Sequence, residues 1–406
     1  MVTKADNDLL TLVEGDAPMG QMMRQNHWIP ALRAARLETD GDPIRVRLFG
    51  ENFVAFRATD GRIGFFDEAC PHRGVSLALG RNEEGGLRCI FHGWKFRVDG
   101  RCVETPTEAR NPEAFARNVK VRHYPVREAG GLLWVWLAAG EPGRFTDLPF
   151  THMANDAVFV ASTKIPVNYL QGLEATLDSS HIGFLHRDWF ADLGANFTGA
   201  STDFAPRYEL KDTDYGFRCA ALRNLPDGVV NVRCNEFVMP FHSSTASGKP
   251  GEGTYQILVP IDNRNTLWIF VRWNELEPVS REGGILAPKD ADLDDWVPSL
   301  GGPDEYWGQD RKSMKNGSFA GFKAGLLTED TVVQISMGPI VDRTKEQLCT
   351  GDAAVMRLRR RLIQAAHDQA EGRRPLGVDP QTSYSRLVAM AANIKQGENW
   401  DDVKFA

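Results

Sequence analysis

A polar stretch between residues 168 and 186 carries side chains that could bind a metal ion. Five of them recur every three or four positions: Asn168, Gln171, Glu174, Asp178 and His181. A helix of about 3.6 residues per turn would place this set on one stripe. With His186 the stretch offers two imidazoles and two carboxylates, and none of these polar positions is Lys or Arg. We therefore expect the stripe to face an interior polar site, although a stripe that faces water remains an alternative.

The two histidines of this stretch predict a ferrous iron site. Two His and one carboxylate, with open coordination positions, are the ligand set of non-haem Fe(II) oxygenases, and His181 and His186 would be the first two ligands. Five residues of straight helix rotate a side chain by about 140°, so the helix must break, and Gly183 is the expected place. Asp178 could accept the ring proton of His181 and fix its tautomer. An isolated pair with this spacing is also compatible with a structural role.

Two loops upstream offer a second set of ligands. Their sequences are Cys70-Pro71-His72-Arg73-Gly74 and Cys89-Ile90-Phe91-His92-Gly93-Trp94. Two thiolates and two imidazoles could hold a tetrahedral zinc ion. They could instead hold a Rieske [2Fe-2S] cluster, in which two Cys bind one iron and two His bind the other. Each loop supplies one Cys and one His, and its glycine lets the backbone approach a cluster closely, so the pattern favours the cluster.

The segments around these loops predict a small all-β module from residue 27 to about residue 140. Two pairs of apolar runs flank Asp-Gly turns, which is typical of β-hairpins. The runs and turns are 53–56 and 63–66 around Asp60-Gly61, and 95–98 and 101–103 around Asp99-Gly100. Strands of this kind would hold the two loops in place.

The iron stretch is followed by a predicted antiparallel sheet. Alternating apolar runs between residues 201 and 274, such as 254–260 and 266–273, are typical of its strands. The iron helix and the C-terminal helices would cover one face of this sheet and give an α+β body. Residues 352–371 predict an amphipathic helix with Asp352 as its N-cap. Its arginines are expected to form a solvated face: Arg357, Arg359, Arg360 and Arg361.

Composition describes a globular chain of two or three domains. The 406 residues are 42% hydrophobic, and 47 Lys and Arg against 54 Asp and Glu give a net charge of −7. The acidic balance and the lack of a basic aromatic-rich patch argue against nucleic acid as a partner. No apolar run has membrane-spanning length, and the acidic first residues do not resemble a signal peptide. Six Cys are too few for a disulfide scaffold, so the cytoplasm is the expected location.

The two Cys/His loops, followed by the pattern Asn168-x2-Gln-x2-Glu-x3-Asp-x2-His-x4-His, resemble the large (alpha) subunit of Rieske non-haem iron aromatic-ring-hydroxylating oxygenases. The resemblance spans nearly the whole chain. It implies an α+β protein in which an all-β Rieske [2Fe-2S] domain precedes a catalytic domain with a helix-covered antiparallel sheet. The expected ranges are 1–26 for a helical segment that packs on the catalytic domain, 27–142 for the Rieske domain and 143–406 for the catalytic mononuclear iron domain.

The resemblance also implies which residues bind the metals. The cluster ligands would be Cys70, His72, Cys89 and His92, and the ligands of the single iron would be His181, His186 and Asp330. Glu329 remains a lesser alternative to Asp330, because adjacent side chains rarely both reach one ion. Residues 334–343 are similar to the phthalate dioxygenase branch, whose oxygenases consist of one kind of subunit.

Members of this family are implied to work as head-to-tail trimers or stacked hexamers. In such an assembly Asp178 would act catalytically by linking His181 to His92 of the partner subunit. A separate reductase of the flavin and iron–sulfur type would deliver electrons from NAD(P)H, with O2 as co-substrate. The implied activity, in aromatic compound catabolism, is dioxygenation of an aromatic carboxylate or aryl ether. Single hydroxylation or O- or N-demethylation stays an alternative, as does, more distantly, a non-catalytic electron carrier or zinc-binding protein.

An aromatic carboxylate would need an arginine in an otherwise apolar pocket, because a guanidinium pairs a carboxylate bidentately. Four arginines of the catalytic half are candidates: Arg207, Arg223, Arg233 and Arg272. We select Arg207 as the substrate-binding residue, with Phe237, Met239 and Phe241 as apolar lining. Each of these residues is also compatible with a surface ion pair or with the core.

Overall fold

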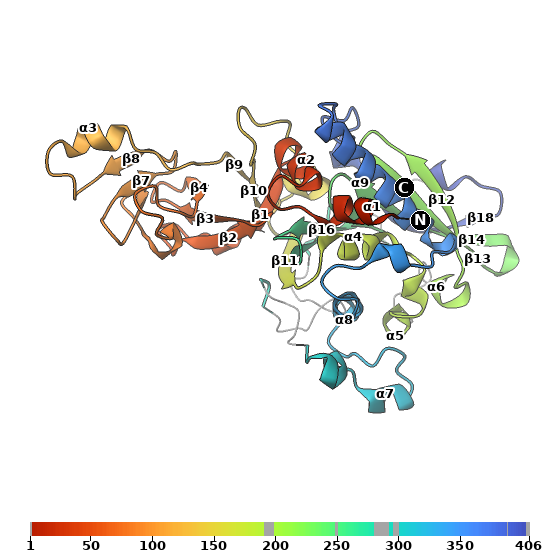
Figure 1. Ribbon diagram of the computed structural model, residues 1–406. Coiled ribbons are helices and arrows are strands. Elements are labelled where there is room, and N and C mark those ends of the chain that lie inside the picture. The colour runs from red at the N-terminus through yellow and green to blue at the C-terminus, as the bar shows by residue number, and fades with distance from the viewer. Residues whose placement is uncertain are drawn as a thin grey trace. The chain divides into compact units, whose positions relative to one another are not determined.

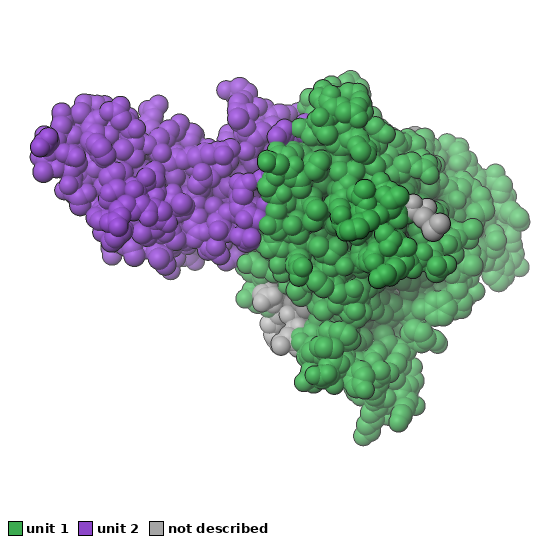
Figure 2. All heavy atoms as spheres, viewed as in Figure 1, with its two compact units in different colours: residues 1–23, 147–406 green, residues 24–146 purple. Residues whose placement is uncertain are grey.

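Antiparallel strands form the framework of both parts of the chain in the computed structural model (Figure 1). The structure describes residues 2–190, 199–247, 251–279, 292–294, 300–387 and 389–402. Residues 24–146 form one compact unit, and residues 1–23 together with 147–406 form the other (Figure 2). The α+β class predicted from the sequence is confirmed.

The unit of residues 24–146 is built from three small antiparallel sheets. The first has the order β1 (Ile29–Arg33), β10 (Leu132–Val135), β9 (Val126–Ala129), and the second has the order β2 (Ile44–Leu48), β3 (Glu51–Arg57), β4 (Ile63–Asp67). The third runs β5 (Arg81–Glu83), β6 (Gly86–Arg88), β7 (Lys95–Arg97), β8 (Cys102–Glu104), and helix α3 (Pro112–Arg117) follows it. Both predicted hairpins are confirmed as β3–β4 and β7–β8, with Gly61 and Gly100 at positive φ in their turns.

The core of this unit surrounds the two cysteines of the predicted cluster loops. Cys70 and Cys89 are each 3% exposed and belong to one buried apolar cluster. Its larger members come from several strands and loops: Val54, Phe56, Phe66, Leu77, Leu87, Trp94 and Phe96. The close packing of these side chains fixes the positions at which both loops begin.

The other unit contains an eight-stranded antiparallel sheet. Its order is β11 (Val158–Ile165), β17 (Thr266–Asn274), β16 (Glu252–Pro260), β15 (His242–Thr245), β14 (Val229–Val238), β13 (Gly216–Asn224), β12 (Arg207–Asp212), and β18 (Met390–Lys395) also pairs with β14. The predicted strands at 254–260 and 266–273 are therefore confirmed as β16 and β17. Large side chains that are at most 1% exposed anchor this sheet: Tyr255, Trp268 and Trp273.

Helices pack on this sheet and on one another. Helix α4 (Tyr169–Leu177) contacts β14 to β17, and α1 (Lys4–Thr11), α4 and α9 (Ala353–Ala370) lie side by side (Figure 1). Helix α8 (Leu326–Ser336) contacts α4. The other described α-helices are α2 (Pro18–Asn26), α5 (Arg187–Phe190), α6 (Gly199–Thr202) and α7 (Arg311–Lys315).

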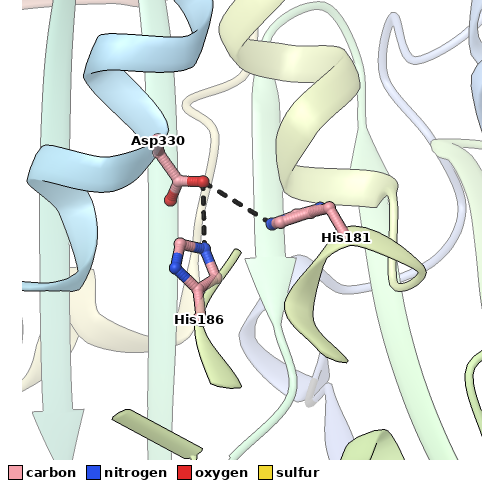
Figure 3. A group of neighbouring side chains, drawn as sticks. All are labelled: His181, His186 and Asp330. Carbon is pink, nitrogen blue, oxygen red and sulfur yellow. Dashed lines mark hydrogen bonds and ion pairs between the residues drawn. The ribbon is translucent and has the colours of Figure 1, made fainter. Parts of the chain in front are cut away.

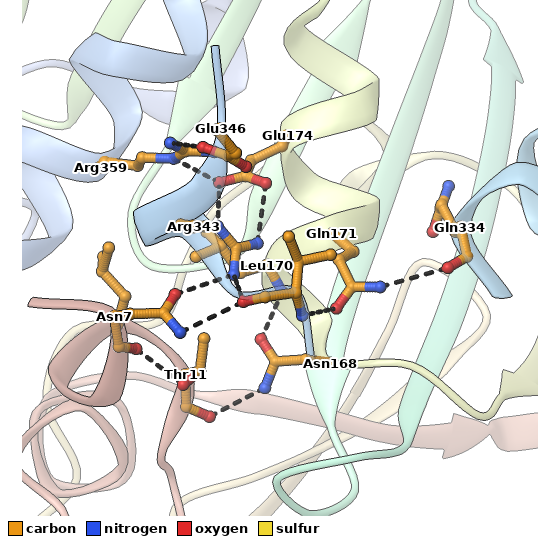
Figure 4. A network of polar contacts seen from close by, with 12 residues as sticks. Asn7, Thr11, Asn168, Leu170, Gln171, Glu174, Gln334, Arg343, Glu346 and Arg359 are labelled. Atoms are coloured by element: carbon orange, nitrogen blue, oxygen red, sulfur yellow. Dashed lines mark hydrogen bonds and ion pairs between the residues drawn. The ribbon is translucent and has the colours of Figure 1, made fainter. Parts of the chain in front are cut away.

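A buried polar network joins α4 to segments that are distant in sequence (Figure 4). Glu174 accepts hydrogen bonds from Nε and Nη2 of Arg343, at 3.0 and 2.8 Å, and from Nε of Arg359, at 2.7 Å. Arg343 also donates to Asn7, and Arg359 also pairs with Glu346. Burial alone would raise the pKa of Glu174, but the two guanidinium groups lower it below its ordinary value of 4.5.

Helix α9 spans nearly the predicted range, but one expectation about it is wrong. Arg359 is only 4% exposed, so it does not belong to a solvated face. Glu174 and Glu346 compensate its charge. Both lie outside the helix, so the sequence pattern of the helix does not predict these ion pairs. Asp352 occupies the N-cap position, as predicted, but its carboxylate accepts from the backbone N–H of Cys349 and not from the first turn of the helix.

Candidate metal centres

The two histidines can meet because helix α4 ends before the first of them. The helix stops at Leu177, and Asp178 has extended backbone angles. A single 3-10 turn, His181–Gly183, follows, and the next helix begins at Arg187. The break therefore starts several residues before the predicted position. Gly183 has another role, because a Cβ there would lie 2.3 Å from the carbonyl oxygen of Ala200.

Helix α8 brings a carboxylate to these two rings (Figure 3). Oδ1 of Asp330 lies 3.1 Å from Nε2 of His186 and 3.5 Å from Nε2 of His181. Ligand atoms about 2.1 Å from one ion and at right angles lie about 3 Å apart. One donor atom from each of the three residues lies within 4.8 Å of the others. The three side chains thus fit a single metal ion and leave its remaining positions to other ligands.

Glu329 approaches the same histidine from its opposite edge. Its Oε2 lies 2.7 Å from Nδ1 of His186, while Asp330 faces Nε2. Glu329 is 1% exposed, and His186 is equally buried. Burial alone would lower the pKa of His186, but the carboxylates of Asp330 and Glu329 raise it to about 9. An excess of carboxylate over imidazolium makes this centre attractive to a divalent cation.

Asp178 stands on the outer side of His181. Its Oδ2 lies 3.3 Å from Nδ1 of His181, and its Oδ1 accepts from the backbone N–H of Ser180. The Tyr208 hydroxyl donates weakly to the same oxygen, at 3.4 Å. The side chain of Asp178 is 26% exposed, so this carboxylate is reachable from solvent.

The two loops of the smaller unit have the same backbone hydrogen bonds. Cys70 N donates to Val75 O and Gly74 N to Cys70 O, and the second loop repeats this with Cys89, Trp94 and Gly93. Both glycines have positive φ, +76° and +73°. The half-buried rings of His72 and His92 lie 4.5 Å apart, and His72 stacks on Trp94. Each loop therefore holds a buried thiol and a more exposed imidazole in a defined turn.

The positions of these four side chains distinguish a diiron cluster from a zinc ion. Around one tetrahedral zinc the ligand atoms lie within about 4 Å of one another. Within the described part of the chain, no three of the four donors come within 4.8 Å of one another. Nδ1 of His92 is buried and has no hydrogen-bond partner among the described residues, as expected of a nitrogen kept for a metal. Separate Cys and His pairs fit a Rieske cluster.

A pocket that is partly open to solvent adjoins the three-donor centre, and the empty space in and in front of it amounts to about 410 Å³. Its lining contains Asp178, His181, His186 and Asp330, together with small and apolar residues. The other polar side chains in the lining are Thr176, Arg233, Thr245, Gln256, Trp268 and Gln334. Gln334 is 1% exposed, and neither atom of its amide group has a hydrogen-bond partner among the described residues.

Arg233 is the arginine of this lining. Its Nη1 donates to Oγ of Ser179 at 2.8 Å, and its Nε has no partner within the described residues. Burial lowers the pKa of Arg233 to about 10, and Arg223 acts in the same direction. Asp178 acts on this pKa in the opposite direction, and the contacts of Arg233 within the described residues include no ion pair.

The substrate residues selected from the sequence lie elsewhere. Arg207 is exposed on β12 and pairs with Glu209. Phe237, Met239 and Phe241 are at most 1% exposed and lie in the core, outside the pocket lining. Arg223 is buried but donates to the backbone carbonyl groups of Asp203 and Ser179, and Arg272 stands over the ring of Phe159. The sequence did not predict Gln256, Trp268 and Gln334 as pocket residues. An apolar pattern predicts which face of a strand or helix is buried, but not where a pocket opens on that face.

Comparisons with known proteins identify what this chain is similar to. Residues 27–125 match the family described as the Rieske [2Fe-2S] domain, and residues 135–406 match the LigXa C-terminal domain like family. The oxygenase subunit of phthalate 4,5-dioxygenase from Pseudomonas putida is 39% identical over 99% of this chain and 94% of that protein. The oxygenase subunit of 3-chlorobenzoate-3,4-dioxygenase from Comamonas testosteroni is 35% identical over 95% of this chain and 93% of that protein.

Solved structures share the fold. NdmA of Pseudomonas putida CBB5, as a QL mutant with caffeine, aligns with a TM-score of 0.61 at 18% identity and covers 96% of this chain and 100% of that one. Within the described residues, no helix has the length and apolar character needed to cross a membrane.

Proposed function

Because this chain belongs to the Rieske non-haem iron oxygenases, we propose that it is a terminal oxygenase component that hydroxylates a small aromatic carboxylate. Electrons would come from NAD(P)H through a separate reductase of the flavin and iron–sulfur type, and O2 would be the co-substrate. We assign residues 27–142 to the Rieske domain, residues 143–406 to the catalytic domain and residues 1–26 to a helical segment that packs on the latter.

We further assign two sets of metal ligands. Cys70, His72, Cys89 and His92 would hold the [2Fe-2S] cluster, and His181, His186 and Asp330 would hold the ferrous ion. When bound, the cluster supplies single electrons and the ferrous ion supplies the reaction with O2. The distances of 3.1 and 3.5 Å around Asp330 and the unpartnered Nδ1 of His92 support this assignment.

The observation that carries the substrate class is Arg233 in the pocket wall beside the iron ligands. The guanidinium of Arg233 is half-buried, and its buried Nε has no hydrogen-bond partner among the described residues, so an anionic ligand in the pocket would satisfy it. Its planar fork pairs a carboxylate with two hydrogen bonds, and Ser179 already holds one edge of it. Ile182, Trp268 and Leu326 offer apolar surface for an aromatic ring. The two relatives, named for the dioxygenation of phthalate and of 3-chlorobenzoate, agree with this class.

The residues of the chain position the substrate and its surroundings. Arg233 would fix the carboxylate, and the apolar wall would hold the ring with one edge toward His181, His186 and Asp330. The unpartnered amide of Gln334 and Oε1 of Gln256 can bind a second, neutral polar group on the ring. Asp178 would hold His181 in one tautomer through its 3.3 Å contact.

Oxygen uptake with a generic reductase tests the substrate class. We expect benzoates and phthalates to support substrate-dependent uptake and their methyl esters to fail, because an ester cannot pair with Arg233. Product mass then distinguishes two added oxygens, which we expect, from one added oxygen or a lost methyl group. A preference for esters or for uncharged aromatics over the acids would contradict the proposal.

A further inference from the structure

The closest contact of His186 with a carboxylate is made away from the pocket. Nδ1 of His186 lies 2.7 Å from Oε2 of Glu329, and the two side chains are 2% and 1% exposed. Nε2 on the other edge of the ring faces Asp330 at 3.1 Å. Glu329 and Asp330 are neighbours on helix α8, so one helix supplies a carboxylate to each nitrogen of a single imidazole.

An ionised carboxylate only accepts hydrogen bonds, so the nitrogen that faces Glu329 carries a proton. Nε2 faces Asp330 in the same way, and a metal ion bound on that side would replace the Nε2 proton and take its lone pair. The metal-binding form of the ring is therefore the one that keeps its proton on Nδ1, toward Glu329. The lone pair of Nε2 then points to the side where Asp330 lies and where His181 also presents its Nε2. A carboxylate behind a metal-binding histidine fixes the orientation of the ring and raises its basicity.

The two histidines are held in different ways. The contact between His181 and Asp178 measures 3.3 Å, and these side chains are 24% and 26% exposed. The contact between His186 and Glu329 is shorter and almost free of solvent. Water can replace a lost partner at the exposed contact but hardly at the buried one. His186 should therefore depend on its carboxylate more than His181 does.

Resting on the ligand set of the proposed function, we propose that Glu329 is a positioning residue that holds His186 in its metal-binding tautomer and thereby determines how firmly the chain keeps the ferrous ion. Glu329 does not itself reach the ion, because its contact is with the far nitrogen of the ring. This role separates the two neighbouring carboxylates: Asp330 lies on the ligand side and Glu329 lies behind the ligand.

The test compares Glu329→Gln with Asp178→Asn in the full-length protein loaded with both metal centres. After dialysis against a ferrous chelator, the single iron is counted apart from the cluster, whose absorption reports the Rieske unit. We expect Glu329→Gln to bind the single iron about 10- to 100-fold more weakly, with the cluster unchanged, and Asp178→Asn to keep its iron. Excess ferrous ion should refill Glu329→Gln but not His186→Ala.

A spectroscopic measurement accompanies the iron count. The electron paramagnetic resonance signal of the nitric oxide adduct of the refilled site should change in Glu329→Gln, because the orientation of His186 is no longer fixed. A merely structural role would lower the melting temperature but leave this signal as in the wild type. If Glu329→Gln does not fold, Glu329→Asp replaces it in the test, because the shorter side chain moves the carboxylate away from His186 by one methylene. We expect the same weaker iron binding and the same change in the adduct signal.

Two results would overturn the positioning role alone, and a third would overturn the proposed function with it. Equal iron retention and an unchanged adduct signal in the Glu329 variant would overturn the positioning role while leaving the proposed function intact. A Glu329 variant that cannot be refilled at any ferrous concentration would identify Glu329 as a ligand and also overturn it. If the wild type itself binds no single iron, the ligand set and the proposed function fail together.

Discussion

Arg233 is the side chain on which the choice of substrate should depend most directly. Among the four candidate arginines, only the surroundings in the fold distinguish it: Arg207 is at the surface, Arg223 is bonded to backbone carbonyls and Arg272 lies over a ring. An alternating strand pattern shows which face a side chain takes, but not whether a pocket opens there. The metal-binding residues were easier to predict from the sequence, because only a few residue types, His and Asp among them, supply ligands for ferrous iron.

Replacing Arg233 tests its role. We expect Arg233→Met to raise KM for an aromatic carboxylate about a hundredfold, corresponding to about 3 kcal/mol for the loss of a buried charge partner. The kcat value at saturation should change much less. Steady-state oxygen uptake measures both constants, and Arg207→Met, at an exposed position, is the matched control with an unchanged KM. Equal effects of the two substitutions would exclude Arg233 from carboxylate binding.

Helix α4 shows how far a local pattern can be interpreted. The sequence predicts that its polar stripe faces one interior site, but in the structure the side chains of the stripe take part in three kinds of contact. Asn168 and Gln171 donate hydrogen bonds to backbone carbonyl groups, those of Thr11 and Gly338. Glu174 belongs to the network with the two arginines. Asp178 and His181 lie at the metal centre. The lack of Lys and Arg within the stripe does not mean that none contacts it, because Arg343 and Arg359 come from 169 and 185 residues away.

The arginine network predicts a pH-dependent stability for this helix. The folded-state pKa of Glu174 is lowered, so its contribution to stability is fully present above its ordinary pKa of 4.5 and is lost as the pH falls through the folded-state value. Glu174→Gln leaves two buried guanidinium groups undercompensated and should cost about 3 kcal/mol at pH 7. Urea unfolding of both proteins at pH 7 and pH 3 measures this, and the difference should shrink at pH 3. A difference that is independent of pH would show that the charge of Glu174 contributes nothing.

At the scale of the whole molecule, the proposed function requires electrons to pass from a Rieske unit to a catalytic unit. Hairpins and Cys/His loops predicted the first unit well, because their turns and ligands are local in sequence. The second unit depends on strand pairings between distant segments, such as β14 with β18, which local patterns do not specify. We propose that a homotrimer or stacked hexamer provides the route, with Asp178 linking His181 to His92 of the partner subunit.

Asp178→Asn tests this route. The variant should keep both metal centres, since Asp178 lies behind His181 and is partly exposed to solvent. Substrate-dependent reoxidation of the reduced cluster, followed by stopped-flow absorption, should slow at least about a hundredfold, because a neutral amide no longer joins the two histidines as a carboxylate does. Iron and sulfide analysis of the same sample is the control. Wild-type reoxidation rates in the variant would refute the bridge.

Metal analysis of three proteins tests the central claim most directly. If one set of side chains holds a diiron cluster and another holds a single iron, the wild type contains about three irons and two sulfides per chain. His186→Ala should then contain about two irons with an unchanged cluster spectrum, and Cys89→Ser about one iron and no sulfide. Zinc in place of iron in the wild type, or a full iron content in His186→Ala, would contradict the account.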